Sequence, residues 1–405
     1  MAVETQDLDA AVVGLGPAGL VAALALAAAG LRVGLIGPPP DAPSLARDTR
    51  TTALFGGSIA LLRHLGVWAA LEPDAAPLNG LRLVDATGGL LRAPETLFQA
   101  AETGRVAFGW NVENARLISA LHDRARAVGD IRHEARPLAR LVAEGLRATL
   151  TLDDGARLTA RLVVGADGRQ SLCREAANVE TRRWSYPQGA IATRFRHSRP
   201  HAGVSSELHY RHGPVTTVPL PGNASSLVWV DRSETIDTLQ RLTDTDFTAA
   251  LEEKLQGLLG GITGLGARAA FPLTGLTAKP AAHQRIVLIG EAAHVLPPIG
   301  AQGLNLGFRD AAWIAELAGA AQAAGRDIGD DAVLQDYRAA RSTDVATRTL
   351  AVEWLNRSLT ADLLPADLMR GAGIATLTAW PWLRRRVMQE GMVPSGPQPR
   401  LLREA

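Results

Sequence analysis

The sequence predicts an α/β fold, α+β overall, in which a parallel sheet with helices is interrupted by a mainly antiparallel sheet and followed by C-terminal helices. Three observations predict it. Residues 9–37 have the pattern of a strand, a glycine-rich turn, a helix and a second strand. Residues 188–230 contain many short strand-like stretches, separated by turn pairs such as Gly213-Pro214. Residues from about 344 onward have a mostly helical pattern. Segments of such different character are typical of this mixed class.

Length and composition exclude several classes of protein. The chain has 405 residues, enough for two or three domains, and 47% of them are hydrophobic, too many for a disordered chain. The formal net charge of +1 gives no indication of a nucleic-acid partner. Cys173 is the single cysteine, which excludes a disulfide framework or a cysteine metal cluster, and we expect no metal site. One cysteine also suits a reducing compartment, so we expect a cytoplasmic protein.

The first predicted unit carries a glycine pattern between its first strand and its helix. Gly14, Gly16 and Gly19 form a Gly-x-Gly-x-x-Gly turn, and a second strand follows over residues 31–36. Such glycines permit a tight turn and close backbone approach, and the helix N-terminus offers amide donors to a diphosphate. The context predicts dinucleotide binding, and the alternative is a glycine turn in an ordinary strand–helix unit. The second strand usually ends in an acid that holds a ribose, but Gly37 stands there, so that contact is unassigned.

A second motif follows a predicted hairpin in the middle of the chain. Residues 146–152 and 157–164 have strand patterns and are joined at Asp153-Asp154-Gly155, which is a turn signal. The second of these strands leads directly into Gly165-Ala166-Asp167-Gly168.

A third motif follows a short apolar strand over residues 285–289. It reads Gly290-Glu291-Ala292-Ala293-His294, and a carboxylate at a strand end can accept hydrogen bonds from ribityl hydroxyls. We interpret His294 as a structural residue rather than a catalytic base. A helix is predicted to begin near Gly303, and its amides would face the pyrimidine edge of a flavin, which becomes negative on reduction.

Two polar residues elsewhere are further candidates. Arg50 precedes a predicted helix, where a lone arginine is usually a solvated charge; beside the other motifs it is a candidate for the phosphate or ribityl side of a flavin. Asn114 begins another predicted helix, where it either reaches the cofactor or caps the helix.

Together the motifs resemble the aromatic-ring flavoprotein monooxygenases of the para-hydroxybenzoate hydroxylase fold, and more narrowly the ubiquinone-biosynthesis hydroxylases. The resemblance covers nearly the whole chain, to about residue 393. The motifs that carry it are Gly14 to Gly19, Asp48-x-Arg50-x-x-Ala53-Leu54, Val112-Glu113-Asn114, Gly165-Ala166-Asp167-Gly168-x-x-Ser171-x-x-Arg174, Trp184-x-Tyr186-x-Gln188, Pro219-Leu220-Pro221, Gly290 to His294, and Pro298 to Asp310. Two departures are Gly37 in place of the usual acid and Glu291 in place of the usual Asp.

The resemblance implies an FAD cofactor and transient binding of NAD(P)H as electron donor. Reduced flavin would react with O2 to give a C4a-hydroperoxide, which transfers one oxygen to an electron-rich ring, that of a polyprenylated ubiquinone precursor. No indispensable catalytic side chain is expected, and the loop with Pro297, Pro298 and Gly300 would lie near the isoalloxazine. The cofactor-binding residues that we expect are Gly14, Gly16, Ala18, Gly19, Arg50, Asn114, Asp167, Gly168, Gly290, Glu291, Gln302, Gly303, Leu304 and Asn305.

We expect two interleaved domains. Residues 1–78, 104–180 and 276–343 would form a Rossmann-like FAD-binding domain, and residues 79–103 and 181–275 a substrate domain. Residues 344–405 would form a C-terminal helical segment that ends in a loose tail.

The sequence of the C-terminal segment fits two different kinds of contact. Trp380 and Trp382 stand beside Arg384-Arg385-Arg386, which is either a membrane-interface pattern or a capping helix with a solvated face. Peripheral contact with the inner face of the membrane, or a ubiquinone-synthesis complex, would suit a polyprenylated substrate. Three alternative functions are a hydroxylase of another phenolic or secondary metabolite, a flavin-binding assembly subunit with little turnover, and a flavin reductase or dehydrogenase.

Overall fold

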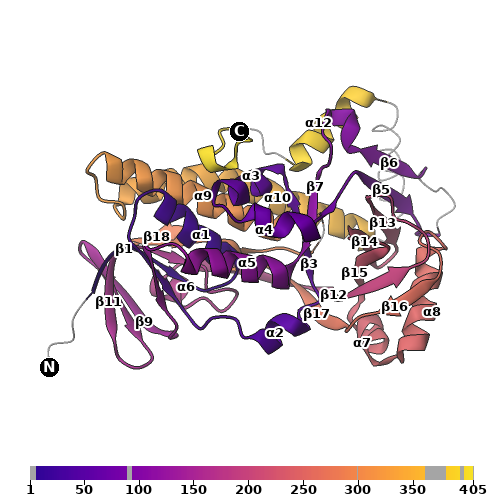
Figure 1. The fold of residues 1–405 in the computed structure, drawn as a ribbon, viewed down its shortest axis with the longest axis horizontal. Helices are drawn as coiled ribbons and strands as arrows, with labels where there is room; N and C mark the ends of the chain where they lie inside the picture. Colours follow the sequence, from indigo (N-terminus) through magenta and orange to yellow (C-terminus); the bar gives the residue numbers. More distant parts are fainter. Residues whose placement is uncertain (1–5, 89–93, 299, 361–379, 393–395, 405) are drawn as a thin grey trace.

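A computed structural model describes residues 6–88, 94–298, 300–360, 380–392 and 396–404 (Figure 1). The strands of its first sheet are β1 (Gln6–Val13), β2 (Val33–Ile36), β8 (Ile131–Glu134), β9 (Leu138–Glu144), β10 (Arg147–Leu152), β11 (Arg157–Gly165), β18 (Ala282–His283) and β19 (Ile286–Leu288). Their order is β18-β19-β11-β1-β2-β8, and β10 and β9 continue from β11. Strands β19, β11, β1, β2 and β8 are parallel to one another, whereas β10 and β11 form the predicted hairpin.

Helices pack on this sheet and enclose the main hydrophobic core. The larger ones are α1 (Pro17–Ala28), α3 (Gly56–His64), α5 (Asn114–Arg126), α9 (Gln302–Ala323) and α10 (Asp331–Thr360). The chain also has the shorter helices α2 (Ala42–Arg47), α4 (Trp68–Leu71), α6 (Leu172–Ala176), η1 (Glu72–Asp74), η2 (Ala100–Thr103) and η3 (Gly290–Ala292), of which η2 contacts residues 96–99 of the second large sheet rather than the first sheet. Helix α1 is apolar on all sides, and residues 19–27 are buried because it lies between the sheet and α9.

The second large sheet is built from the middle of the chain (Figure 1). Its strands are β5 (Gly80–Asp85), β6 (Thr96–Gln99), β12 (Glu180–His197), β13 (Val204–Tyr210), β14 (Gly213–Leu220), β15 (Ala224–Arg232), β16 (Ile262–Leu265), β17 (Ala269–Lys279) and β20 (His294–Val295). They follow the order β20-β17-β12-β15-β14-β13-β5-β6, with β16 beside β12. All described pairs are antiparallel except β5 with β13. The predicted mixed fold with a mainly antiparallel second sheet is therefore confirmed.

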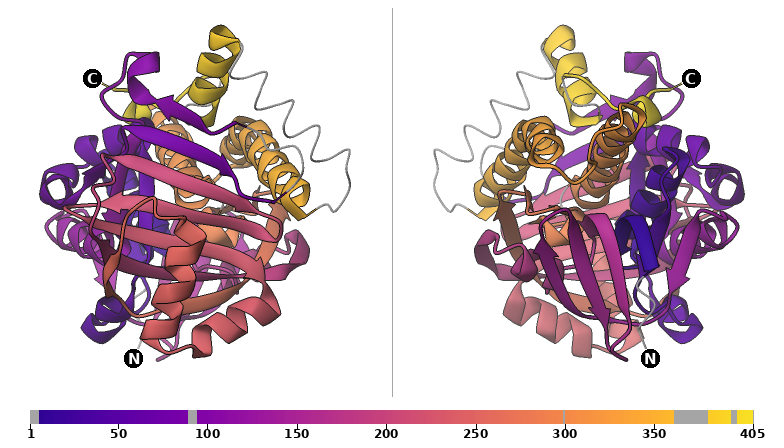
Figure 2. Two further views of the ribbon diagram at one scale, coloured as in Figure 1. Left: turned by 90° about the vertical axis from the view of Figure 1, so that its right-hand side faces the viewer. Right: turned by 90° about the vertical axis from the view of Figure 1, so that its left-hand side faces the viewer.

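Helices α7 (Ser233–Arg241) and α8 (Asp244–Leu255) cover the outer face of this sheet, as Figure 2 shows. Phe195 and Trp229 of the sheet pack there against Phe247 and Leu251 of α8. Elsewhere this sheet meets the rest of the molecule, and β14 contacts α10 and residues 109–113.

A small third sheet joins the two large ones. It has the order β3-β7-β4 and consists of β3 (Thr51–Phe55), β7 (Gly109–Glu113) and β4 (Ala76–Pro77). Thr51 Oγ1 donates to Ser226 Oγ over 2.8 Å, and Asn111 Nδ2 donates to the carbonyl of Pro219 over 2.9 Å. We keep the domain boundaries given above as a proposal, although β17 crosses residue 276 and β20 belongs to the second sheet.

The C-terminal segment differs from the expectation of a loose tail. Helix α12 (Pro381–Met392) packs on η2, and the turn η4 (Arg400–Leu402) packs on α3 and α9. Leu402 is buried, and the backbone N–H of Arg400 donates to Glu316 over 2.6 Å. Three prolines suggested a loose chain, but Leu402 supplies an apolar anchor and residues 396–404 are ordered against the body of the protein.

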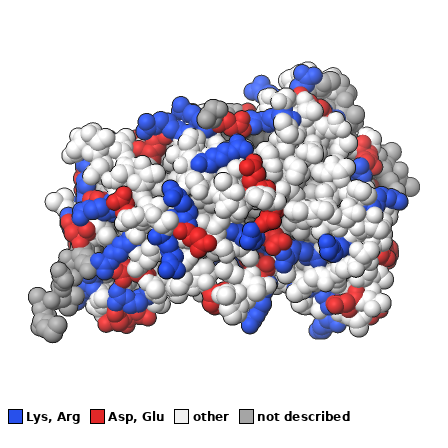
Figure 3. All heavy atoms as spheres, in the orientation of Figure 1, with Lys and Arg blue, Asp and Glu red and all other residues white. Residues whose placement is uncertain are grey.

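The surface shows no large field of one sign on the face drawn in Figure 3, where basic and acidic side chains are interspersed. This fits the net charge of +1. Among the described helices, none combines the length and the apolar character that a membrane crossing requires.

Candidate cofactor and active site

The glycine turn between β1 and α1 contains two kinds of glycine. Gly14 has a φ of +110°, and a Cβ on it would lie 2.4 Å from the carbonyl oxygen of Ala166; a Cβ on Gly19 would lie 2.0 Å from the carbonyl oxygen of Gly14. The packing of the protein itself therefore requires glycine at positions 14 and 19. Gly16 is exposed and has an ordinary φ of −71°, and a Cβ on it would meet no atom within 4 Å. The N-terminus of α1 is thus open to a ligand, which fits a diphosphate.

The three sequence motifs come together in space. Strands β1, β11 and β19 are parallel neighbours, so the glycine-rich segments that follow them emerge at one edge of the sheet. A Cβ on Gly290 would lie 3.1 Å from the Cβ of Ala18, and one on Gly307 would lie 3.3 Å from the same atom. The start of α1, the turn η3 and the first part of α9 are therefore in close contact, at the edge where parallel α/β sheets bind ligands.

Asp167 and Gly168 have different environments in the second motif. Asp167 accepts hydrogen bonds from Ser171 Oγ over 2.6 Å and from the backbone N–H of Cys173 over 3.0 Å, so its carboxylate stabilises the start of α6. Gly168 has a φ of +78°, and a Cβ on it would meet nothing within 4 Å. The open backbone at Gly168, rather than the engaged carboxylate of Asp167, is the part of this motif available to a ligand.

Arg174 has a role that the sequence did not reveal. Its side chain is buried, and it donates to the carbonyl of Ala292 over 2.9 Å and to that of Arg169 over 2.8 Å. Burial lowers the pKa of its guanidinium below the ordinary value. Arg174 connects the second motif to the third. The only indication of this in the sequence is that Arg174 ends the motif that begins at Gly165.

Glu291 lies at the surface and pairs with Arg169 over 3.0 Å. Arg50 makes two hydrogen bonds of 2.8 Å to Asp48, and Asp48 together with the nearby Glu291 raises its pKa. Burial by itself would raise the pKa of Asp48, but the hydrogen bonds from Arg50 outweigh it and the pKa lies below its ordinary value. The structure thus brings Arg50 and Glu291, which are far apart in sequence, into one charged cluster.

We predict that Glu291→Gln weakens FAD binding while leaving stability nearly unchanged. The pair with Arg169 is about half exposed, so its loss changes the free energy of unfolding by about 1 kcal/mol or less. If the carboxylate accepts a ribityl hydroxyl, losing the charge-assisted hydrogen bond weakens FAD by roughly 10- to 100-fold. FAD titration of the apoprotein measures this, with Glu95→Gln as control, because the Glu95 side chain is 56% exposed and also pairs with an arginine, Arg82. Equal FAD affinity in both variants would show that Glu291 does not contact the cofactor.

Asn114 is the first residue of α5, and the capping position belongs to Glu113. Its side-chain oxygen accepts a hydrogen bond from Thr52 Oγ1, and its backbone N–H donates to the carbonyl of Arg50 over 3.1 Å. Asn114 therefore ties α5 to the Arg50 segment, and direct contact with the cofactor stays a proposal.

Helix α9 begins at Gln302, one residue before the predicted start, after Ala301 in a left-handed conformation. Gly303 is exposed, and Leu304 packs against the main core. Asn305 is buried and donates to the carbonyls of Ala53 and Ala301.

Asn305 also accepts from the backbone N–H of Phe55 and from Ser58 Oγ. It therefore holds the loop before α9 against β3, which leaves the backbone around Gly303 as the exposed part of this motif. The loop itself contains buried Pro297, exposed Pro298 and Gly300 with a φ of +67°. Ile299, within the quoted motif, lies outside the described residues.

A buried ionic network lies behind this loop. Asp310 accepts from His294 Nε2 and Arg341 Nε, each over 2.6 Å, and from the backbone N–H of Gly290 over 3.1 Å. Arg341 also pairs with Asp344 over 2.6 Å. His294 is buried and is held by Asp310, and its interpretation as a structural residue stays a prediction.

The network reaches the start of α9. Asp344 binds Arg309 over 2.9 Å and Arg348 over 3.2 Å, and Arg348 Nη1 donates to Gln302 Oε1 over 2.9 Å. Helix α10 therefore holds the side chain of Gln302 through Arg348, which is itself held by Asp344. Buried charges that pair with one another in this way favour one geometry.

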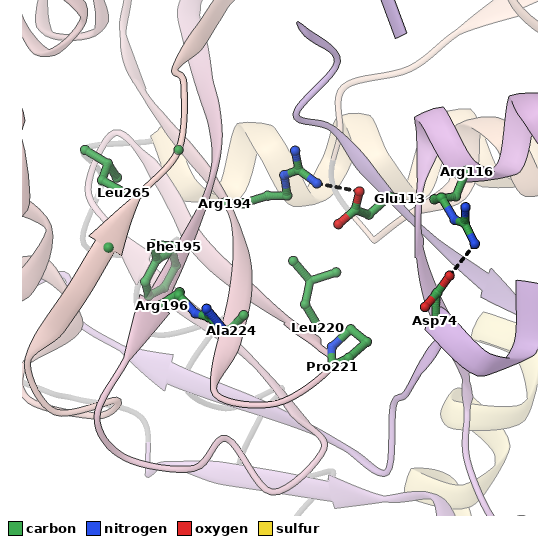
Figure 4. A pocket seen from close by; sticks show the side chains of 12 residues that line it. Asp74, Glu113, Arg116, Arg194, Phe195, Arg196, Leu220, Pro221, Ala224 and Leu265 are labelled. Atoms are coloured by element: carbon green, nitrogen blue, oxygen red, sulfur yellow. Dashed lines mark hydrogen bonds and ion pairs between the residues drawn. The ribbon is translucent and has the colours of Figure 1, made fainter. Parts of the chain in front are cut away.

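A cavity of about 720 Å³ lies where β12, β14 and β16 face β7 and α5 (Figure 4). Its walls include the apolar side chains of Phe195, Leu220 and Leu265. Arg194 of β12 pairs with Glu113 of β7 over 2.5 Å across it. Leu220 belongs to a quoted motif, but Arg194 was missed because a single arginine in a strand carries no sequence signal.

The fold and these glycine-lined openings define a dinucleotide-binding flavoprotein, and the comparisons with known proteins identify its family. The family described as FAD binding domain matches residues 7–351. Ubiquinone hydroxylase UbiL of Rhodospirillum rubrum is 36% identical over 403 residues, covering 98% of this chain and 92% of that protein. The 3-demethoxyubiquinol 3-hydroxylase of Escherichia coli is 28% identical over 397 residues, covering 95% and 98%. Among solved structures, p-nitrophenol 4-monooxygenase PnpA from Pseudomonas putida matches with a TM-score of 0.77 at 18% identity, covering 95% and 98%.

The chain belongs to the FAD binding domain family. The predicted family resemblance, the FAD cofactor and the class of FAD-dependent oxidoreductase are confirmed. At Gly16, Gly168 and Gly303 a Cβ would meet no protein atom within 4 Å, so the backbone there is open to a ligand. A Cβ at these positions would occupy the space of that ligand, and the open backbone therefore fits FAD. Individual contacts between FAD and the predicted residues stay proposals.

Proposed function

We propose that this protein is an FAD-dependent monooxygenase that hydroxylates the aromatic ring of a polyprenylated ubiquinone precursor, with NAD(P)H as donor and O2 as oxygen source. The observation that carries the proposal is the match over 98% of the chain to a ubiquinone hydroxylase. The cavity between the cofactor domain and the antiparallel sheet supports it. When bound, FAD supplies the chemistry, because it accepts a hydride and, once reduced, activates O2.

The protein's own residues bind, orient and exclude water. The N-terminus of α1 would hold the diphosphate, and the amides at the N-terminus of α9 would stabilise the negative charge that the flavin gains on reduction. Arg348 and Asn305 hold the α9 loop in place. NAD(P)H binds transiently at the open backbone of Gly168.

The ring of the substrate enters the larger cavity. Its lining combines apolar residues such as Leu220 and Leu265, which suit an aromatic ring or a prenyl chain, with two ion pairs, Arg194–Glu113 and Arg116–Asp74.

We predict that Ala224→Trp lowers kcat/KM for hydroxylation at least tenfold without loss of FAD. Ala224 lines the cavity and is partly exposed, so an indole there occupies space that the substrate needs. Asn223→Trp is the matched control, since Asn223 is the preceding residue, is exposed and does not line the cavity. Steady-state kinetics and the flavin absorbance of both variants give the answer. Unchanged kinetics in Ala224→Trp would exclude this cavity as the substrate site.

The substrate is identified by mass spectrometry of the quinone fraction from cells that lack this gene. We expect a polyprenylated ring that is short of one oxygen and that disappears when the wild-type gene is restored. A normal ubiquinone profile would point to a hydroxylase of another phenolic compound. Rescue by a Gly16→Asp variant that binds no FAD would instead point to an assembly subunit.

Contact with a membrane is a further part of the proposal, and α12 supports it. One side of this helix caps the second sheet, because Arg384 stacks on Phe98 and pairs with Glu102 over 2.7 Å. Trp380, which directly precedes this helix, and Trp382 within it are 55% and 64% exposed, near exposed Arg385 and Arg386.

We therefore predict that anionic liposomes retain the wild-type protein at low salt. Replacing Trp380 and Trp382 together with Ser removes the exposed aromatic surface and is expected to release the protein. Sedimentation with phosphatidylglycerol vesicles measures the bound fraction. A wild-type protein that stays in the supernatant would leave α12 as a capping helix only.

A further inference from the structure

A second cavity of about 220 Å³ lies between α3, α9 and the C-terminal segment, and it shares no lining residue with the larger one. Leu402 of the tail forms part of its wall, so the ordered C-terminus is what closes it. The polar lining residues that matter here are Ser58, Arg105, Asn305, Arg309, Arg403 and Glu404.

The lining carries an excess of positive charge. Its three arginines face one carboxylate, that of Glu404, which pairs with Arg105 over 2.7 Å. Arg403 donates to the backbone carbonyl of Gln398 from Nε over 3.0 Å and from Nη2 over 2.7 Å. Arg309 and Arg403 are therefore the two cations of the lining that have no carboxylate of the lining as partner.

Of these two arginines, Arg309 is the stronger candidate for binding an anion. It is 5% exposed, its Nε donates to Asp344 over 2.9 Å, and its Nη2 is buried without a hydrogen-bond partner among the residues that the structure describes. It also shares Asp344 with Arg341 and Arg348. Burial lowers the pKa of Arg309 to about 10, against the opposing effect of Asp344. A buried donor left unpaired in this way is costly. The side chain of Arg309 keeps a small exposed fraction, and Arg309 is among the residues that line the cavity.

We propose that this cavity binds a small oxyanion, a phosphate or a carboxylate, with Arg309 as its main ligand and Arg403 as the second. Its volume suits an ion or a short acid rather than a nucleotide. Guanidinium groups match the planar geometry of carboxylates and phosphates, and Ser58 adds a hydroxyl to the same wall.

The site is coupled to the cofactor loop. Asn305 lines the cavity and at the same time bonds to the carbonyls of Ala53 and Ala301, which flank the start of α9. Arg309 lies one helical turn further along α9, on the same side as Asn305. An oxyanion on Arg309 is thus one side chain away from the loop that faces the flavin.

The test uses the FAD-loaded protein and isothermal titration with inorganic phosphate and, separately, with acetate, at constant ionic strength. We expect one binding site per chain. Arg309→Met should weaken binding at least tenfold, and Arg403→Gln should weaken it to a smaller degree. Arg400→Gln is the control, because Arg400 lies in the same tail with its side chain 80% exposed and does not line the cavity.

Binding of phosphate alone or of acetate alone would assign the site to that oxyanion and support the proposal. If Arg309→Met does not fold, weaker binding in Arg403→Gln than in Arg400→Gln supports it equally. Absence of binding of both anions to the wild-type protein would overturn the proposal, as would equal affinity in the wild type and all folded variants.

Discussion

Gly16→Asp is expected to fold normally and to lose FAD, with an affinity at least 100-fold below that of the wild type. Gly16 has an ordinary φ and an open position for a Cβ, so the protein itself tolerates a side chain there. The new carboxylate would stand at the N-terminus of α1, where the diphosphate needs the amide donors. It would exclude the phosphates by volume and repel them by charge. A 100-fold loss corresponds to about 2.7 kcal/mol.

Gly129→Asp is the matched control. A Cβ on Gly129 also meets nothing within 4 Å, but this residue lies before β8 and away from the glycine turn. Flavin absorbance of the purified proteins and FAD titration of the apoproteins measure the effect. FAD retained by Gly16→Asp at wild-type affinity would show that the diphosphate lies elsewhere.

Asp310→Asn is expected to lower the free energy of unfolding by about 3–5 kcal/mol. Asp310 is 1% exposed and is the shared acceptor of His294, Arg341 and the backbone of Gly290. The variant keeps the shape of the side chain but leaves the buried Arg341 without one of its two carboxylates. Since the network reaches Gln302 through Asp344 and Arg348, weaker FAD binding should accompany the loss of stability.

Denaturant unfolding measures this effect, and Asp331→Asn is the control. Asp331 pairs with Arg338 over 3.4 Å but is 69% exposed, so its loss changes stability by about 1 kcal/mol or less. Equal effects of the two substitutions would contradict the role given to the buried network.

The same variant has a characteristic pH dependence. Burial by itself would raise the pKa of Asp310, but His294 and Arg341 hold it well below its ordinary value. When the folded-state pKa is lowered, the unfolded chain takes up the proton first as the pH falls. The stability that Asp310 contributes is therefore complete above its ordinary pKa of about 4 and is lost below it. The difference between wild type and Asp310→Asn should be largest above about pH 5 and shrink below about pH 4.

Features set by local backbone geometry were predictable from the sequence. Gly14 has a positive φ that other residues rarely adopt, and Gly155 has the same property in the hairpin turn between β10 and β11. The three motifs follow strands that lie next to one another in the sheet. Their convergence follows from the rule that parallel strands present their carboxyl ends together.

The buried network was not predictable in this way. Arg341 and Asp344 stand in a long helical pattern rich in charges, where solvent exposure is the usual outcome, and only the packing of α10 on α9 buries them. Arg384 is a similar case, because one arginine of a cluster of three turns inward to Phe98 and Glu102. Whether such a charged residue is buried depends on packing between distant segments. A periodic sequence pattern gives no information about that packing.

The ordered tail and the second cavity have the same origin. Leu401 and Leu402 are two apolar residues in a proline-rich, charged segment, and such a short pair carries too little signal to predict an anchor. Their pocket is formed by α3 and α9, which come from distant parts of the chain. Leu402 and Arg403 join the lining of this cavity only once the tail is in place.

The most direct test of the proposed function is oxygen incorporation from ¹⁸O2. The FAD-loaded protein is supplied with NADH or NADPH and a short-chain version of the prenylated ring that accumulates in the deletion strain, and the product is analysed by mass spectrometry. We predict one ¹⁸O atom per hydroxylated product, with donor oxidation that depends on the substrate. Product oxygen derived from water, or donor oxidation without any labelled product, would contradict the assignment of this protein as a monooxygenase.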